Sequence, residues 1–176
     1  PKEFNKKDWI GAFAVTAGTN VDKLSKISAN NNNDYESIMI KIIGDRIAEA
    51  MAEKMHESVR KELWGYASKE KLSNSDLIRE RYTGIRPAPG YPACPDHSEK
   101  AKIWKLLDIE NNSKMKLTES YAVSPASSVT GWYFSHPESK YFAVNRISNE
   151  QFKNYSKRKG LSEKNLKKIF PHILQE

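Results

Sequence analysis

A proline-rich segment holds the side chains best suited to binding a small charged molecule. Residues 85–95 include four prolines, with Arg86 near the start and Gly90 and Tyr91 in the middle. Proline fixes the backbone and cannot donate a hydrogen bond, so we expect a rigid extended loop. Arginine can clamp a carboxylate, glycine allows close backbone approach, and tyrosine offers an aromatic face. An amino-acid-bearing ligand needs these groups, although a structural connector can have the same composition.

Two carboxylates lie four residues apart in a segment with helical periodicity. Asp45 and Glu49 therefore share one helix face, and His56 lies further along the same side. Paired carboxylates can act as acid and base or can accept hydrogen bonds from a ligand ammonium, although a solvated helix face shows the same pattern. A zinc protease is excluded, because Arg60 stands where the second histidine of its helical motif belongs.

The single cysteine, Cys94, lies three residues before His97, near the predicted start of a helix. A helix N-terminus lowers the pKa of a thiol, so a cysteine-dependent hydrolase is one alternative function. No third catalytic partner is apparent, and we expect a packed, inert cysteine. One cysteine and four histidines provide no zinc site. A lone thiol also favours a reducing, cytoplasmic compartment.

The sequence carries a net charge of +7, which favours acidic partners without naming one. Seven of the cations lie on one C-terminal stretch: Lys153, Lys157, Arg158, Lys159, Lys164, Lys167 and Lys168. A nucleic-acid-binding module is a second alternative function, but the sequence has no recognised nucleic-acid motif and its charge gathers near one end. No apolar run is long enough to span a bilayer and no signal peptide opens the chain, so we expect no membrane partner.

The elements that must position these residues are visible in the hydrophobic periodicity. An apolar run over 9–18 predicts a buried strand. An apolar residue at every fourth position over 35–64 predicts one long helix, which ends at Gly65. The residues of this stripe are Met39, Ile43, Ile47, Met51, Met55, Val59 and Leu63. Because such spacing drifts around a helix, the stripe should wind and contact more than one neighbour.

Capping signals and turns divide the rest of the chain. Four further helices are predicted: from Ser73 to Gly84, from Asp96, from Ser148 to Gly160, and from Ser162 to Pro171. Short β-branched and aromatic segments over 115–123, 129–134 and 141–144 predict an antiparallel meander. The predicted fold class is α+β, with an antiparallel sheet and flanking helices that include one long central helix.

Four stretches of the sequence carry a family resemblance. Residues 86–97 read RPAPGYPACPDH, and Arg86, Gly90 and Tyr91 meet the spacing Arg-x-x-x-Gly-Tyr. The other three stretches are 8–16, 117–120 and 131–141. Together they resemble the activation domain of cobalamin-dependent methionine synthase, in order and over essentially the whole chain. The resemblance implies that residues 1–176 form most of one S-adenosylmethionine-binding domain, without its N-terminal portion. The first residue is Pro1, not Met, as expected of an excised or processed piece.

The resemblance also implies a function. The full enzyme is a methyltransferase that makes methionine from homocysteine through cobalamin. Its activation domain presents the methyl group of S-adenosylmethionine to cob(I)alamin during reductive reactivation, with an electron from flavodoxin or a diflavin reductase. Cobalamin is held by a neighbouring module of the same polypeptide, and zinc belongs to the full enzyme only. We expect no catalytic residue here, because a good leaving group is displaced by a strong nucleophile, and we expect the isolated chain to be inactive.

The same resemblance assigns the residues that contact the ligand. They are Arg86, Ala88, Gly90, Tyr91, Tyr141, Phe142 and Glu49. Phe142 stands where the family often has a tyrosine, so a hydroxyl contact is not expected there. Asp45, one helical turn from Glu49, is expected to face the cobalamin module. Neither nucleic acid nor a metal ion is expected to bind this chain.

Overall fold

The computed structural model describes residue 5 and residues 7–169 and 173–174. A two-stranded antiparallel sheet lies at the centre, formed by β1 (Gly11–Thr16) and β4 (Ser128–Tyr133). Phe13 and Val15 pack towards the long helix on one side of β1, whereas Ala12 and Ala14 contribute to the hydrophobic cluster of the helices on the other side. Alternate residues of a strand face opposite sides, so β1 separates two small cores.

The start of the proline-rich loop extends this sheet along the second edge of β4. Ile85 and Phe134 exchange backbone hydrogen bonds of 2.9 and 3.0 Å, and the Trp132 N–H donates to the Pro87 carbonyl at 2.9 Å. Proline can occupy this edge position because the pairing uses its carbonyl oxygen as a hydrogen-bond acceptor and does not require a backbone N–H. Gly131 makes the approach possible, since a Cβ there would lie 2.8 Å from the Pro87 carbonyl oxygen.

The α+β class and the antiparallel pairing are as predicted, but the strand assignment differs in detail. Residues 141–144 form no strand, because the Val144 N–H donates to the Pro92 carbonyl at 2.8 Å and the segment follows the loop instead. Residues 115–123 do not form one strand: they hold β2 (Lys116–Leu117) and the first residue of β3 (Val123–Ser124), which pair with each other. The partner of β4 comes instead from the N-terminal part of the chain.

The long central helix is α2 (Asp34–Ser58), and it continues into a π-helical turn, η2 (Val59–Leu63). Asn33 caps it by accepting a hydrogen bond from the Glu36 N–H at 3.1 Å. The buried face of α2 carries small residues, so neighbouring elements approach closely. Those residues are Ser37, Gly44, Ala48 and Ala52, followed by His56. Most of the apolar stripe that we expected to wind into the core is exposed: Ile43, Ile47, Met51 and Met55.

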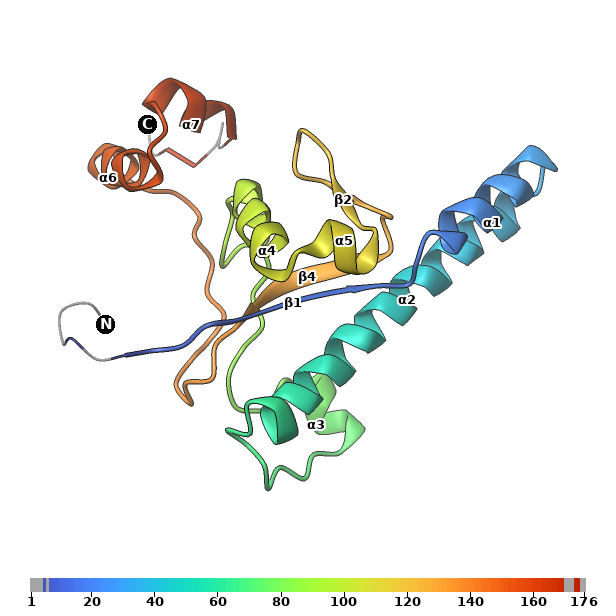
Figure 1. The fold of residues 1–176 in the computed structure, drawn as a ribbon, viewed down its shortest axis with the longest axis horizontal. Coiled ribbons are helices and arrows are strands. Elements are labelled where there is room, and N and C mark those ends of the chain that lie inside the picture. Colours follow the sequence, from blue (N-terminus) through green and yellow to red (C-terminus); the bar gives the residue numbers. More distant parts are fainter. Residues whose placement is uncertain (1–4, 6, 170–172, 175–176) are drawn as a thin grey trace.

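Helix α1 (Asn20–Asn30) was not expected and packs antiparallel to α2 as a projecting hairpin (Figure 1). The Ser25 and Ser37 hydroxyls share a buried hydrogen bond of 2.8 Å across the pair. A Cβ at Gly44 would lie 2.6 Å from a Val21 methyl, so the two backbones are close. Because α1 buries serines and exposes Leu24 and Ile27, hydrophobic periodicity does not reveal it.

The remaining helices are short and flank the sheet and the loop. They are α3 (Asn74–Ile78), η3 (His97–Glu99), α4 (Lys100–Leu107), α5 (Ile109–Ser113), α6 (Asn149–Lys159) and α7 (Glu163–Ile169). The predicted capping boxes at Ser73 and Ser148 are confirmed, and α6 ends at Gly160 as expected. Helix α3 ends at Ile78, before the predicted Gly84, and Pro171 lies outside the described residues.

Candidate functional site

The loop carrying Arg86, Ala88, Gly90 and Tyr91 runs between the sheet edge and the helix α4. Gly90 has φ of +97°, a conformation that glycine adopts without strain, and its N–H donates to the Cys94 carbonyl at 2.7 Å. A Cβ at Gly90 would lie 2.4 Å from the His97 ring. The loop is therefore held in one tight shape, as its four prolines suggested.

Four of the predicted contact residues meet in one depression of about 440 Å³. Glu49 enters it from α2, whereas Ala88, Gly90 and Tyr91 enter it from the loop. The Tyr91 side chain is well exposed, and a ligand can reach its ring. The volume is in the range of small-molecule sites, and one carboxylate beside loop backbone and an aromatic face suits a zwitterionic ligand.

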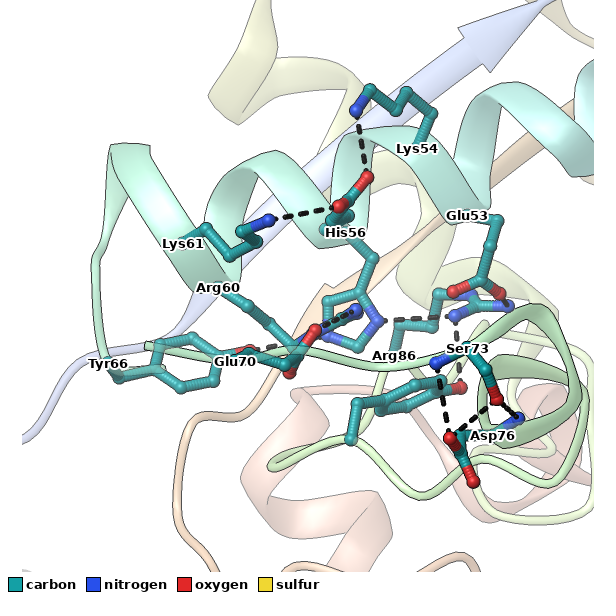
Figure 2. A network of polar contacts seen from close by, with 12 residues as sticks. Glu53, Lys54, His56, Arg60, Lys61, Tyr66, Glu70, Ser73, Asp76 and Arg86 are labelled. Carbon is teal, nitrogen blue, oxygen red and sulfur yellow. Dashed lines mark hydrogen bonds and ion pairs between the residues drawn. The ribbon is translucent and has the colours of Figure 1, made fainter. Parts of the chain in front are cut away.

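Arg86 turns its guanidinium into the protein (Figure 2). Its Nη2 donates to Glu53 Oε2 at 2.7 Å, and its Nη1 contacts the Tyr82 hydroxyl at 3.0 Å and His56 Nδ1 at 3.2 Å. The Arg86 side chain is 17% exposed. These four residues, called here the Arg86 cluster, attach the start of the loop to α2.

The other predicted residues lie around this centre. The Arg86 N–H donates to the Tyr141 hydroxyl at 3.0 Å, which brings these two together. Phe142 instead lines a separate, largely apolar groove of about 790 Å³ with Trp132 and Phe134. Asp45 accepts a hydrogen bond from the Ser127 hydroxyl at 2.7 Å and lines none of these depressions. The predicted set is therefore divided between neighbouring surfaces.

A second buried ion pair packs against the Arg86 cluster, with the guanidinium carbon of Arg60 lying 4.5 Å from the centroid of the Tyr82 ring. Arg60 has no exposed side-chain surface and forms a two-pronged contact with Glu70, through Nη2 at 2.8 Å and Nε at 2.9 Å. Burial, reinforced by Arg60 and Arg86, lowers the pKa of His56 to about 3. The imidazole is therefore neutral at physiological pH, between two arginines.

Comparison with known proteins identifies the family to which this arrangement belongs. A sequence model of the family described as vitamin B12 dependent methionine synthase, activation domain, matches residues 1–160. The chain belongs to this family. A solved structure described as the crystal structure of the MetH reactivation domain bound to AdoHcy is 54% identical, and it matches 100% of this chain with a TM-score of 0.97. The chain spans 54% of the length of that solved chain.

Within this activation-domain family fold, the cysteine alternative finds no support. Burial, with the nearby Glu99 and Asp96 carboxylates, raises the pKa of the Cys94 thiol. The Nδ1 atom of His97 contacts Lys100 Nζ at 2.9 Å, so its ring is engaged with another partner. Neither residue is arranged as a nucleophile with its base.

One residue of the predicted basic face of the activation domain, Lys159, does not lie on the exposed surface. Lys159 is largely buried, where it contacts Asp96 and reaches Glu99 Oε1 at 2.7 Å. The Tyr155 hydroxyl also donates to Asp96, at 2.5 Å. These contacts bind α6 to the end of the proline-rich loop, and so Lys159 is a structural tie.

Sequence reasoning missed the part that Glu53 and Tyr82 play in holding Arg86, and it did not anticipate the contacts of His56 with Arg86 and Tyr66. One signal was available: the series Gly44, Ala48, Ala52, His56 and Arg60 recurs every four residues, and small residues mark the buried face of α2. A histidine and an arginine that continue such a face must be paired inside the protein. Among the described residues, no group of acidic, histidine or cysteine side chains could hold a metal ion, and no helix could cross a membrane.

Proposed function

We propose that this chain supplies the main part of an S-adenosylmethionine site that serves the reactivation of methionine synthase. The observation that carries the proposal is the depression in which Glu49 meets Ala88, Gly90 and Tyr91. Support comes from the related solved structure, whose description names AdoHcy, the product left when S-adenosylmethionine gives up its methyl group. The family of the chain points to the same reaction.

In this proposal each residue binds or orients the ligand. Glu49 accepts hydrogen bonds from the ligand ammonium, and Tyr91 places its ring beside the adenine or the sulfonium. The Ala88 and Gly90 backbone approaches the polar edge of the ligand, while Arg86 and Tyr141 fix the start of the loop. Phe142 offers an apolar contact from the neighbouring groove, and Asp45 faces the cobalamin module.

The methyl transfer requires these side chains only to position the ligand. Cobalamin, held by a neighbouring module of the polypeptide, supplies the cobalt that accepts the methyl group. On loss of the methyl group the sulfur–carbon bonding pair would stay on sulfur, so AdoHcy would leave as a neutral thioether. No proton moves, and no general base is required. Positioning of the sulfonium is the contribution of this chain.

Partners follow from the same proposal. The electron comes from flavodoxin or a diflavin reductase, acidic proteins that the exposed cations of α6 and α7 would attract at low ionic strength. These cations are Lys153, Lys157, Arg158, Lys164, Lys167 and Lys168. The enzyme acts in the cytoplasm, where its thiol stays reduced.

Calorimetric titration with S-adenosylmethionine and with AdoHcy tests the proposal. It should be run on this chain and on a version extended to the length of the matched structure, and we expect the extended version to bind more tightly. Glu49→Gln and Tyr91→Ala should each weaken binding about tenfold, the usual loss for one charged hydrogen bond or one aromatic contact. Glu62→Gln, an exposed carboxylate beyond α2, is the matched control. Absence of binding in both lengths would reject the function.

A further inference from the structure

His56 is a fully enclosed polar residue in contact with Arg86. Its side chain is 0% exposed and lies between two aromatic rings. Tyr133 stacks on it with ring centroids 5.1 Å apart, and Tyr82 meets it edge-on at 4.9 Å. An imidazole enclosed in this way cannot turn freely, so its two nitrogen atoms have fixed partners.

Those partners determine where the imidazole carries its proton. Nδ1 lies 3.2 Å from Arg86 Nη1, and Nε2 lies 3.2 Å from the Tyr66 hydroxyl. A guanidinium can only donate hydrogen bonds, so Nδ1 must accept and must be unprotonated. The proton of the neutral ring is then on Nε2, which donates to Tyr66.

The surrounding charges favour the same form. Arg60 and Arg86 are the two cations of this interior, and Glu70 and Glu53 balance them one for one. The remaining titratable groups around the ring are the hydroxyls of Tyr66, Tyr82 and Tyr133. A second ring proton, on Nδ1, would point at the guanidinium of Arg86 and would add a positive charge that no carboxylate offsets.

We propose that His56 is a positioning residue of the ligand site: as an unprotonated acceptor at Nδ1, it holds the Arg86 guanidinium against α2 and so fixes the loop that binds the ligand. The inference rests on the proposed function for the identity of the ligand, S-adenosylmethionine. Arginine has five N–H donors. His56, Tyr82 and Glu53 use three of them. These three contacts fix the position of the guanidinium and, through it, the start of the loop.

The position of the proton can be measured without any ligand. Ring nitrogen shifts of the unsubstituted chain, labelled with ¹⁵N in its histidines, distinguish a protonated from an unprotonated nitrogen. We expect Nδ1 of His56 in the unprotonated range and Nε2 in the protonated range at neutral pH. A protonated Nδ1 would overturn the proposal, whatever the substituted proteins do.

Three substitutions separate the acceptor from the packing. His56→Phe keeps a flat ring against Tyr133 but removes the acceptor, and it should weaken S-adenosylmethionine binding about tenfold in the length that binds it. His56→Asn places an amide oxygen near the position of Nδ1 and should restore part of the affinity. Tyr66→Phe leaves Nδ1 in contact with Arg86 and should weaken binding less than His56→Phe does.

A readout on Arg86 itself separates this inference from the proposed function. The guanidinium Nη signals of Arg86 should be distinct when the group is held and should average when it rotates freely, as we expect in His56→Phe. Melting temperatures show whether each variant is folded. Unchanged Arg86 signals together with unchanged affinity in a folded His56→Phe protein would sink the positioning role. If the unsubstituted protein fails to bind S-adenosylmethionine but Arg86 is released in His56→Phe, the function is wrong and the anchor stands.

Discussion

The Tyr141 hydroxyl accepts a hydrogen bond of 3.0 Å from the backbone N–H of Arg86, 55 residues earlier in the chain. This contact links two proposed ligand residues that no local pattern connects. It also means that Arg86 is held at both ends, through its main chain by Tyr141 and through its guanidinium by the Arg86 cluster.

Removal of this acceptor should loosen the start of the loop. Tyr141→Phe leaves the Arg86 N–H without its partner, and we expect the affinity for S-adenosylmethionine to fall by about fivefold, the effect of one neutral hydrogen bond. Phe142→Leu, one residue away, keeps that bond and serves as the comparison. Calorimetry measures the affinity of both variants. Equal losses of affinity would show that the Tyr141 hydroxyl makes no specific contribution.

A methyl group at Gly90 should distort the loop. Gly90 has φ of +97° and a Cβ there would lie 2.4 Å from the His97 ring, so Gly90→Ala should destabilise the protein by about 2 kcal/mol and abolish detectable ligand binding. Gly160 has φ of +70° with open space around it, so Gly160→Ala should cost about 1 kcal/mol and leave binding intact. Denaturant unfolding and ligand titration of the two variants provide the test.

The carboxylate of Glu70 should be essential for stability. Glu70→Gln leaves the buried Arg60 guanidinium without a counter-charge, and we expect the free energy of unfolding to fall by about 3–5 kcal/mol. Lys54→Gln, which breaks the exposed pair between Lys54 and Glu57, should cause no measurable change. Urea denaturation of both variants compares the pairs, and similar small effects would mean that water reaches Arg60.

Lys159 should behave differently from its neighbours on α6. Lys159→Met removes the cation between Asp96 and Glu99, so it should lower the free energy of unfolding by about 3 kcal/mol. Lys157→Met, on the exposed side of the same helix, should leave stability unchanged and slow electron delivery only at low salt. If the Lys159→Met protein is as stable as the unsubstituted one, Lys159 belongs to the exposed basic face, as the sequence predicted.

His56 should make stability depend on pH in acid. In the unfolded chain the pKa of His56 is near 6.5, whereas in the folded protein this pKa is lowered to about 3. Between these values the unfolded state holds more protons, so the free energy of unfolding falls as pH falls, by up to about 1.4 kcal/mol per pH unit. His56→Phe should show a smaller slope in this window, and His136→Gln, at an exposed histidine, should show the original slope.

Local signals in the sequence were reliable where the interaction itself is local. The capping boxes at Ser73 and Ser148 join residues three apart, so residue type and spacing are enough to predict them. In the same way, the four prolines were enough to predict a rigid loop. The contact residues themselves came from resemblance to a family, since composition alone does not distinguish a ligand loop from a structural connector.

Distant contacts were beyond the reach of these signals. The contact of Arg86 with Glu53 spans 33 residues, and the pairing of β4 with β1 spans most of the described chain. The exposed stripe of α2 shows a further limit: Ile43 and Met51 have helical spacing, but α1 and the sheet approach the small residues Gly44 and Ala48 instead. Periodicity identifies a helix, and packing decides which of its faces is inside.

The close approach at Gly131 has an evolutionary consequence. Phe13 and the Pro87 carbonyl both lie 2.8 Å from where a Cβ would stand, so any other residue at Gly131 would have to displace the strand or the loop. The sheet and the proline-rich loop therefore cannot diverge independently at this point. Tyr91, at the loop tip, is exposed and free of that steric constraint, so a substitution there would leave the attachment at Gly131 unchanged.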